Sequence, residues 1–131
     1  MGARVTDEAA HVFEGGCHCG AVRLRVVARA LEALDCNCSI CCKKGFLHLI
    51  VPREDFTLLT DEAALAEYRF GTRTARHLFC RRCGVHPFYI PRSHPDRVDV
   101  NVRCLEPPAL DRFTVVPFDG LRWEESVDTI R

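Results

Sequence analysis

Cys17-His18-Cys19 and Cys80-Arg81-Arg82-Cys83 are the two stretches that most constrain the fold of this chain. Each places two thiols one or two residues apart, so both sulfurs can bind the same metal ion without strain. Glycines flank both pairs and permit sharp backbone bends. We expect the pairs to share one closed four-sulfur zinc site that ties the start of the chain to its second half. Spacing alone leaves the pairing open.

A third cluster, Cys36-Asn37-Cys38-Ser39-Ile40-Cys41, offers three thiols on one short turn. Structural zinc sites are closed by four ligands, whereas zinc sites that do chemistry usually keep three protein ligands and one exchangeable position. The cluster therefore predicts a zinc site of the second kind, and an incoming thiolate suits such a sulfur-rich ion. The alternative is a structural site closed by a fourth protein ligand, for which the candidates are Cys42, Cys104, His48 and His86.

The bulk properties indicate one small domain. Of 131 residues, 47% are hydrophobic and 27% charged. We expect residues 1–10 to form a loose polar lead-in and residues 11–131 a single zinc-binding domain. The 18 Lys and Arg balance the 18 Asp and Glu, so no net field favours nucleic acid or an anionic membrane. No apolar run approaches the roughly 20 residues of a membrane span.

Nine cysteines bear on the cellular compartment as well as on metal binding. The first residues lack the apolar stretch of a secretory signal, and an odd number of thiols leaves one over in any disulfide framework. We therefore expect a reducing, cytoplasmic location, with metal ligation favoured over structural disulfides.

Short apolar segments separated by turn residues predict a mainly β fold of short antiparallel strands. Strands are expected at residues 21–27, 46–51, 56–59, 66–70, 75–79 and 98–102. Six prolines between residues 87 and 117 exclude long helices from the second half, which leaves short helical pieces at 39–44 and 109–112. The exposed edges of such strands leave room for a homodimer.

Three cysteine motifs occur in an order that resembles the pattern of a known protein family. They are Gly16-Cys17-His18-Cys19-Gly20-Ala21-Val22, then the cluster at residues 36–41 followed by Lys43-Lys44-Gly45, then Phe79-Cys80-Arg81-Arg82-Cys83-Gly84, with Phe118-Asp119-Gly120 and Trp123-Glu124 beyond. The pattern resembles the glutathione-dependent formaldehyde-activating enzyme family. Within it, the chain is most similar to the centromere protein V branch, through Ile50-Val51-Pro52, Gly84-Val85, Phe88-Tyr89, Pro91-Arg92-Ser93, Pro95-Asp96 and Cys104-Leu105.

The resemblance implies a β-tent fold clipped by two zinc ions, and a carbon–sulfur lyase that forms S-(hydroxymethyl)glutathione from formaldehyde and glutathione. A glutathione-like thiol and a small aldehyde are the implied partners. By the family's motifs, the structural zinc would be held by Cys17, Cys19, Cys80 and Cys83. The catalytic zinc would be held by Cys36, Cys38 and Cys41. Cys42 departs from the family's pattern, and a closing Cys42 would argue against catalysis.

Thiol addition to a carbonyl needs a proton carrier, and His48 and His86 are the predicted candidates. His48 alternates with Leu47 and Leu49 along an expected strand, so it can face the opposite side, toward the site. No such pattern supports His11, His77 or His94.

The densest basic stretch comprises Arg69, Arg73, Arg76, Arg81 and Arg82. It could bind the carboxylates of a glutathione-like substrate, although a solvated face is the simpler interpretation. The alternative function is a zinc-stabilised module that binds protein, chromatin or cytoskeleton without catalysis, and a third is a thiol redox sensor built on Cys41 and Cys42. The neutral charge balance weighs against nucleic acid.

Overall fold

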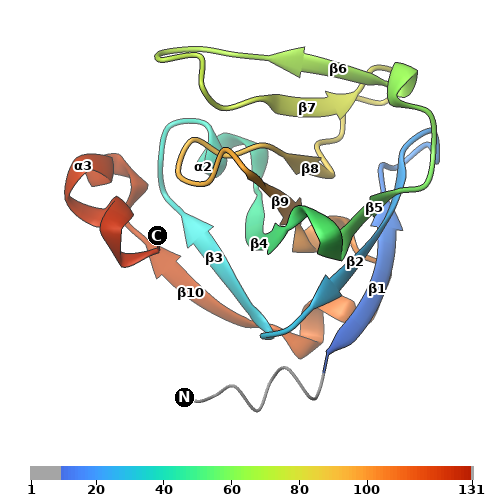
Figure 1. The fold of residues 1–131 in the computed structure, drawn as a ribbon, viewed down its shortest axis with the longest axis horizontal. Coiled ribbons are helices and arrows are strands. Elements are labelled where there is room, and N and C mark those ends of the chain that lie inside the picture. The colour runs from blue at the N-terminus through green and yellow to red at the C-terminus, as the bar shows by residue number, and fades with distance from the viewer. Residues whose placement is uncertain (1–9, 131) are drawn as a thin grey trace.

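The computed structural model describes residues 10–130, and strands make up most of its regular structure (Figure 1). The strands are β1 (His11–Gly16), β2 (Arg23–Ala28), β3 (Glu32–Cys36), β4 (Leu47–Pro52), β5 (Phe56–Leu58), β6 (Leu65–Tyr68), β7 (His77–Cys80), β8 (Phe88–Tyr89), β9 (Arg97–Asn101) and β10 (Thr114–Phe118). The α-helices are α2 (Cys41–Lys44) and α3 (Trp123–Ser126). Single 3-10 turns are η1 (Arg53–Asp55), η2 (Glu62–Ala64), η3 (Val102–Cys104), η4 (Ala109–Arg112), η5 (Gly120–Arg122) and η6 (Val127–Thr129).

The predicted mainly β class is confirmed. The expected lead-in at residues 1–10 lies outside the described residues except for its last position. Among residues 10–130, no helix has the length and apolar character needed to cross a membrane.

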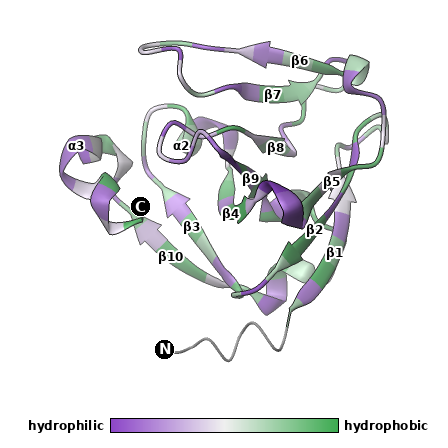
Figure 2. Cartoon of the chain, in the orientation of Figure 1, coloured by the Kyte–Doolittle hydropathy of each residue, from purple (hydrophilic) through white to green (hydrophobic). Residues whose placement is uncertain are grey.

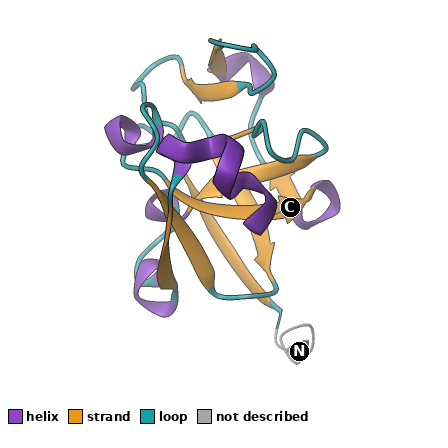
Figure 3. Ribbon diagram, turned by 90° about the vertical axis from the view of Figure 1, so that its left-hand side faces the viewer, coloured by secondary structure: helices purple, strands orange, loops and turns teal. Residues whose placement is uncertain are grey.

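Within residues 10–130 the strands form three sheets, in the orders β1-β2-β5, β10-β3-β4-β9-β8 and β6-β7. In Figure 1 the β6–β7 hairpin lies above β8 and the loop that carries α2. Figure 3 shows the C-terminal helical segment around α3 in front of the strands. The large sheet, the hairpin and this segment therefore surround the loop that follows β3.

Alternation of apolar and polar side chains explains how the sheets build the core. Along β2, Leu24 and Val26 are fully buried while Arg25 is exposed, and Figure 2 shows this alternation on the ribbon. Burying each such side chain contributes about 1.5–3 kcal/mol relative to leaving it in water. On β9 both faces are buried: Val98 and Val100 join the core, and Asp99 faces the other side at 1% exposure. That second face of β9 leads to the candidate site.

Each strand expected from the sequence has a counterpart with bounds that differ by two residues at most, namely β2, β4, β5, β6, β7 and β9. Both short helical pieces are also present, as α2 and the 3-10 turn η4. The sequence pattern did not predict β1, β3, β8, β10 or α3.

One pairing differs from the expected antiparallel fold. β10 pairs with β3 in parallel, with Thr114 opposite Glu32 and Phe118 opposite Cys36. Parallel neighbours need a long connection, which the whole chain between β3 and β10 supplies. Pro117 is tolerated in β10 because this strand lies at the edge of its sheet. The pairing brings residues 118–120 against the cluster that begins at Cys36.

Candidate metal centres

Four thiols from two distant segments meet beside the turn between β1 and β2. Their sulfurs lie within 4.8 Å of one another and belong to Cys17, Cys19, Cys80 and Cys83. Cys19 Sγ is 3.7 Å from both Cys17 Sγ and Cys80 Sγ. Gly20 and Gly84 adopt φ angles of 88° and 79°, a backbone conformation that side chains disfavour. The flanking glycines thus let each turn close tightly enough to bring its thiols together.

This group of sulfurs fits zinc. A Zn–S bond of about 2.3 Å places neighbouring sulfurs of a tetrahedron about 3.8 Å apart. The backbone N–H of Val22 donates to Cys17 Sγ at 3.3 Å, and that of Arg82 donates to Cys80 Sγ at 3.3 Å. The N–H of Val85 lowers the pKa of the Cys83 thiol to about 6. These donors stabilise thiolates, the form that binds a metal.

A second group, the middle cluster, consists of Cys36, Cys38 and Cys41, whose sulfurs also lie within 4.8 Å of one another. Cys36 ends β3 and Cys41 begins α2. The N–H of Cys42 donates to the carbonyl of Cys38 at 3.1 Å, so the chain turns helically directly after the second thiol. This short turn brings three thiols to one point.

Gly120 provides the space that the middle cluster fills. A Cβ at residue 120 would lie 2.3 Å from Cys36 Sγ, far inside any tolerated contact. Asn37 fixes the same two segments together: its side chain donates to Asp119 at 3.1 Å and accepts from the Leu121 N–H at 2.9 Å. The Phe118-Asp119-Gly120 motif therefore forms the back wall of the cluster.

The three thiols of the middle cluster change one another's pKa. Hydrogen bonds from the thiols of Cys36 and Cys41 lower the pKa of Cys38 to about 2. The same crowding, from Cys36 first and then Cys38, raises the pKa of Cys41. Three thiolates so close repel one another, and a divalent cation removes that cost. The donor set therefore fits a metal better than it fits three independent thiols.

No fourth ligand closes the middle cluster within residues 10–130, where no other His, Cys, Asp or Glu atom lies within 4.8 Å of all three sulfurs. Cys42 is exposed, and its thiol donates to the Ser39 carbonyl at 3.7 Å. The Cys104 thiol donates to the His86 carbonyl at 3.7 Å. The geometry therefore does not support closure of the middle cluster by Cys42 or Cys104.

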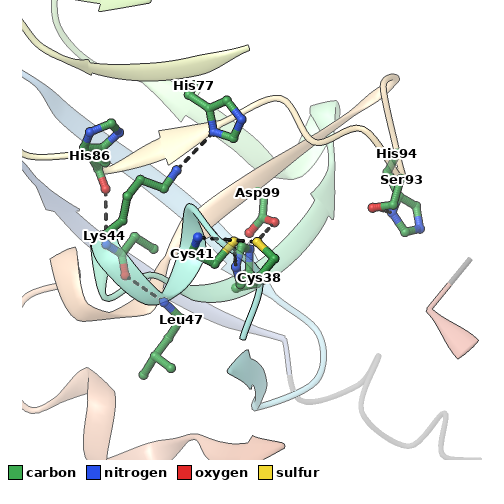
Figure 4. A network of polar contacts seen from close by, with 11 residues as sticks. Cys38, Cys41, Lys44, Leu47, His77, His86, Ser93, His94 and Asp99 are labelled. Carbon is green, nitrogen blue, oxygen red and sulfur yellow. Dashed lines mark hydrogen bonds and ion pairs between the residues drawn. The ribbon is translucent and has the colours of Figure 1, made fainter. Parts of the chain in front are cut away.

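His48 lies directly beside the middle cluster. Its Nε2 is 3.2 Å from Cys41 Sγ, and its Nδ1 is 2.6 Å from the Asp99 carboxylate. His48 and Asp99 are 5% and 1% exposed. The carboxylate favours a proton on Nδ1 and holds the ring with Nε2 toward the thiol. In contrast, the His86 ring packs on Phe79 with centroids 5.2 Å apart, and it points away from Cys38 and Cys41 in Figure 4.

A cavity of about 310 Å³ opens over the middle cluster. The three cysteines, His48 and Asp99 contribute to its lining. Most of the remaining lining is apolar and includes Leu34, Ile50, Phe70, Tyr89, Phe118 and Ile130. A ligand that reached the three sulfurs would therefore lie mainly against apolar side chains.

None of the five arginines of the basic stretch considered for substrate carboxylates contributes to the lining of this cavity, although their neighbours Phe70, Thr72 and Ala75 do. Arg69 and Arg76 pair with Glu67, and Arg81 donates to the Leu65 carbonyl at 2.9 Å. Arg92 lines the cavity instead and pairs with Glu124 at 3.2 Å.

Comparison with known proteins supports this arrangement. The family model described as glutathione-dependent formaldehyde-activating enzyme matches residues 12–115. This chain belongs to that family. A Rhodobacter sphaeroides protein with a solved crystal structure is 35% identical to it, with a TM-score of 0.68 over 79% of this chain and 99% of that one. The placement within the centromere protein V branch stays a prediction.

In this member of the formaldehyde-activating family, Lys44 and His77 lie close to the cavity although no motif pointed to His77. Lys44 Nζ is 3.2 Å from His77 Nδ1 (Figure 4) and 4.4 Å from the centroid of the Tyr89 ring. Burial, and then the charge of Lys44, lower the pKa of His77 to about 4, so its ring is neutral at pH 7. The position of Lys44, three residues after Cys41, was the one sequence feature that could have indicated this contact.

Proposed function

We propose that the chain is a zinc-dependent carbon–sulfur lyase, which forms and cleaves the adduct of a glutathione-type thiol with a small aldehyde such as formaldehyde. The observation that carries the proposal is the middle cluster: three thiols, with no fourth ligand among the described residues, at the floor of a cavity. Membership of the formaldehyde-activating family supports the same activity. The four-sulfur group supports a second, structural zinc.

The proposed reaction is an addition and needs no oxidant or reductant. The thiol sulfur bonds to the aldehyde carbon, the carbonyl π electrons move to oxygen, and this oxygen takes up the proton that the thiol loses. Cleavage reverses these steps. Bound by Cys36, Cys38 and Cys41, zinc would supply an exchangeable position for the substrate thiol and lower the pKa of that thiol. The rest of the cavity would exclude water and place a proton carrier.

His48 is the proposed proton carrier. Its Nε2 faces the middle cluster, 3.2 Å from Cys41 Sγ, while Asp99 fixes Nδ1 at 2.6 Å. Accepting the thiol proton at Nε2 and returning it to the adduct oxygen would complete the addition. His86 does not line the cavity, so we propose no proton transfer through it.

The rate of adduct exchange tests the proposal. Glutathione and formaldehyde combine without a catalyst, so the informative quantity is the acceleration of exchange between free thiol and adduct, measured by NMR exchange spectroscopy on zinc-loaded protein. We expect the exchange rate to rise in proportion to protein concentration. If the zinc-loaded parent protein left exchange at the uncatalysed rate, this result would contradict the proposed lyase function.

Matched variants make the test specific to the middle cluster. Cys41→Ser should fold and lose the acceleration, because Cys41 is one of the three clustered thiols. Cys42→Ser should keep the acceleration, because Cys42 is an exposed neighbour outside the cluster. Full activity in Cys41→Ser would show that the clustered thiols do not carry the reaction.

The state of the cysteines supports a reducing location. Seven of the nine lie in the two groups that could hold metal, and thiols that serve as metal ligands persist where disulfides do not form. We propose a cytoplasmic location on this ground, and mass spectrometry of alkylated cysteines from freshly lysed cells tests it.

A further inference from the structure

The cavity over the middle cluster offers few charges to a substrate. Outside the cysteines, Arg92 and Asp99 are its charged lining residues. Arg92 pairs with Glu124 at 3.2 Å, and Asp99 pairs with His48 at 2.6 Å. Glutathione carries two carboxylates and an ammonium group, and a charge that leaves water without a partner weakens binding. The lining is therefore poorly matched to a charged tripeptide held inside the cavity.

One wall of the cavity is built from three stacked rings. The rings of His77 and Tyr89 lie 4.9 Å apart at an interplanar angle of 11°, and those of Phe70 and His77 lie 5.4 Å apart at 23°. Lys44 Nζ contacts Nδ1 of the His77 ring. Burial lowers the pKa of His77 and so keeps this ring neutral. The stacked faces of Phe70, His77 and Tyr89 contact one another, and Lys44 Nζ lies 4.4 Å from the centroid of the Tyr89 ring. The parts of these rings that line the cavity suit an apolar ring, because aromatic rings also pack edge to face and gain from leaving water.

Two large apolar side chains at the cavity are exposed to water. Phe70 precedes β7 and is 43% exposed, and Leu121 in η5 is 70% exposed. Both line the cavity, although they are distant in sequence. An apolar group in the cavity would cover part of both side chains, which favours binding. Formaldehyde has two heavy atoms and cannot provide such a group.

We infer that the natural substrate adduct carries an apolar, ring-sized group, which lies against Phe70, His77 and Tyr89 while the adduct sulfur faces the middle cluster. The inference rests on the proposed lyase function but departs from its example pair, because glutathione and formaldehyde carry no ring-sized apolar group. Because the thiol and the aldehyde are joined in the adduct, the apolar group can belong to either of them. The reaction remains the balanced addition of a thiol to a carbonyl.

A binding experiment tests the inference separately from turnover. Three probes are titrated into the zinc-loaded full chain by calorimetry: phenylmethanethiol (ring and thiol), benzyl alcohol (ring alone) and glutathione (charged thiol). We expect phenylmethanethiol to bind about tenfold more tightly than glutathione, since apolar pocket contacts discriminate by roughly 10- to 200-fold. Equal or weaker binding of phenylmethanethiol would overturn the inference.

Variants of exposed side chains locate the binding site of the ring. Phe70→Ala should weaken phenylmethanethiol about tenfold and leave glutathione almost unchanged, because it removes one ring of the wall. Leu59→Ala is the matched control: Leu59 is 41% exposed and does not line the cavity. An equal effect of both substitutions, or no effect of Phe70→Ala, would place the ring elsewhere and contradict the inference.

Turnover of two substrate pairs identifies the source of the ring. Benzaldehyde with 2-mercaptoethanol places the ring on the aldehyde, and formaldehyde with phenylmethanethiol places it on the thiol. A higher kcat/KM for either pair than for formaldehyde with glutathione supports the inference and names the source. If glutathione with formaldehyde is the best pair, the lyase function stands and the inference fails. If benzyl alcohol binds and no pair is turned over, the cavity binds an apolar ring but the lyase function is contradicted.

Discussion

Gly120 has no side chain, yet the middle cluster depends on it. A Cβ there would lie 2.3 Å from Cys36 Sγ. We predict that Gly120→Ala loses the metal of the middle cluster, keeps that of the four-sulfur group, and lowers the free energy of unfolding by about 1–3 kcal/mol through overpacking. Elemental mass spectrometry and urea denaturation measure the two effects.

Gly71→Ala is the control for this substitution. A Cβ at residue 71 would meet nothing within 4 Å, and the φ angle of 58° limits the cost to backbone strain of about 1–2 kcal/mol. This variant should keep both metals. Full metal content in Gly120→Ala would show that the close contact is relieved without disturbing the thiols.

Asp99 is the buried residue that orients His48. Asp99→Asn keeps the shape of the side chain but removes the charge that holds His48 Nδ1 at 2.6 Å. We predict a loss of about 1–3 kcal/mol in the free energy of unfolding, together with slower adduct exchange at unchanged metal content. The exposed Asp111→Asn should change neither quantity. Parent-like exchange in Asp99→Asn would mean that the orientation of His48 does not matter.

At this scale the spacing of the cysteines predicted which thiols the fold brings together. Seven cysteines lie in the two groups that were expected. Within each short motif the thiols are close whatever the fold, whereas the meeting of residues 17–19 with residues 80–83 was an expectation that spacing alone left open. Gly120 and His77 were not assigned a role. Their importance comes from contacts with distant segments, at Cys36 and Lys44, and local sequence patterns do not encode such contacts.

At the scale of the elements, β7 carries His77, a buried residue whose protonation makes the stability of the fold depend on pH. Burial disfavours the charged imidazolium and lowers its pKa from 6.5 to about 4. Because the folded-state pKa lies below the unfolded one, His77 costs no stability at high pH and destabilises the fold progressively as pH falls from 6.5 toward 4. NMR of the labelled imidazole should show a neutral ring down to roughly pH 5. A midpoint near 6.5 would contradict the burial of this ring.

Lys44→Met separates the two causes of that shift. Removing the ammonium at 3.2 Å removes the second cause, so the pKa of His77 should rise. It should remain below 6.5 because burial, the larger cause, is unchanged. A pKa that did not move would show that Lys44 does not contact the ring in solution.

Strands with strong apolar patterns were predictable and short or edge strands were not. β2 and β9 carry clear alternation, whereas β8 has two residues and β10 contains Pro117. The parallel pairing of β3 with β10 was not predicted, because it joins segments separated by most of the chain. This pairing places the Phe118-Asp119-Gly120 motif behind the middle cluster, so the site depends on the least predictable part of the fold.

Considering the whole molecule, the four-sulfur group joins the β1–β2 turn to the end of β7 and so crosslinks the two halves of the chain. Structural zinc sites contribute roughly 10–16 kcal/mol in small domains, which is comparable to or larger than the total stability of about 5–15 kcal/mol of a typical domain. We therefore predict that Cys80→Ser is largely unfolded at 25 °C in circular dichroism. Cys42→Ser should melt like the parent protein. A folded Cys80→Ser protein with the parent's melting temperature would refute a structural role for this site.

The two groups of thiols are thus expected to differ in kind: one holds the fold together and the other does chemistry at the base of a cavity. Zinc content per chain in Cys41→Ser, measured by elemental mass spectrometry beside the parent protein, tests this division most directly. The account predicts two zinc ions in the parent and one in a variant that remains folded. One zinc ion in both proteins would contradict it, because the middle cluster would then hold no metal.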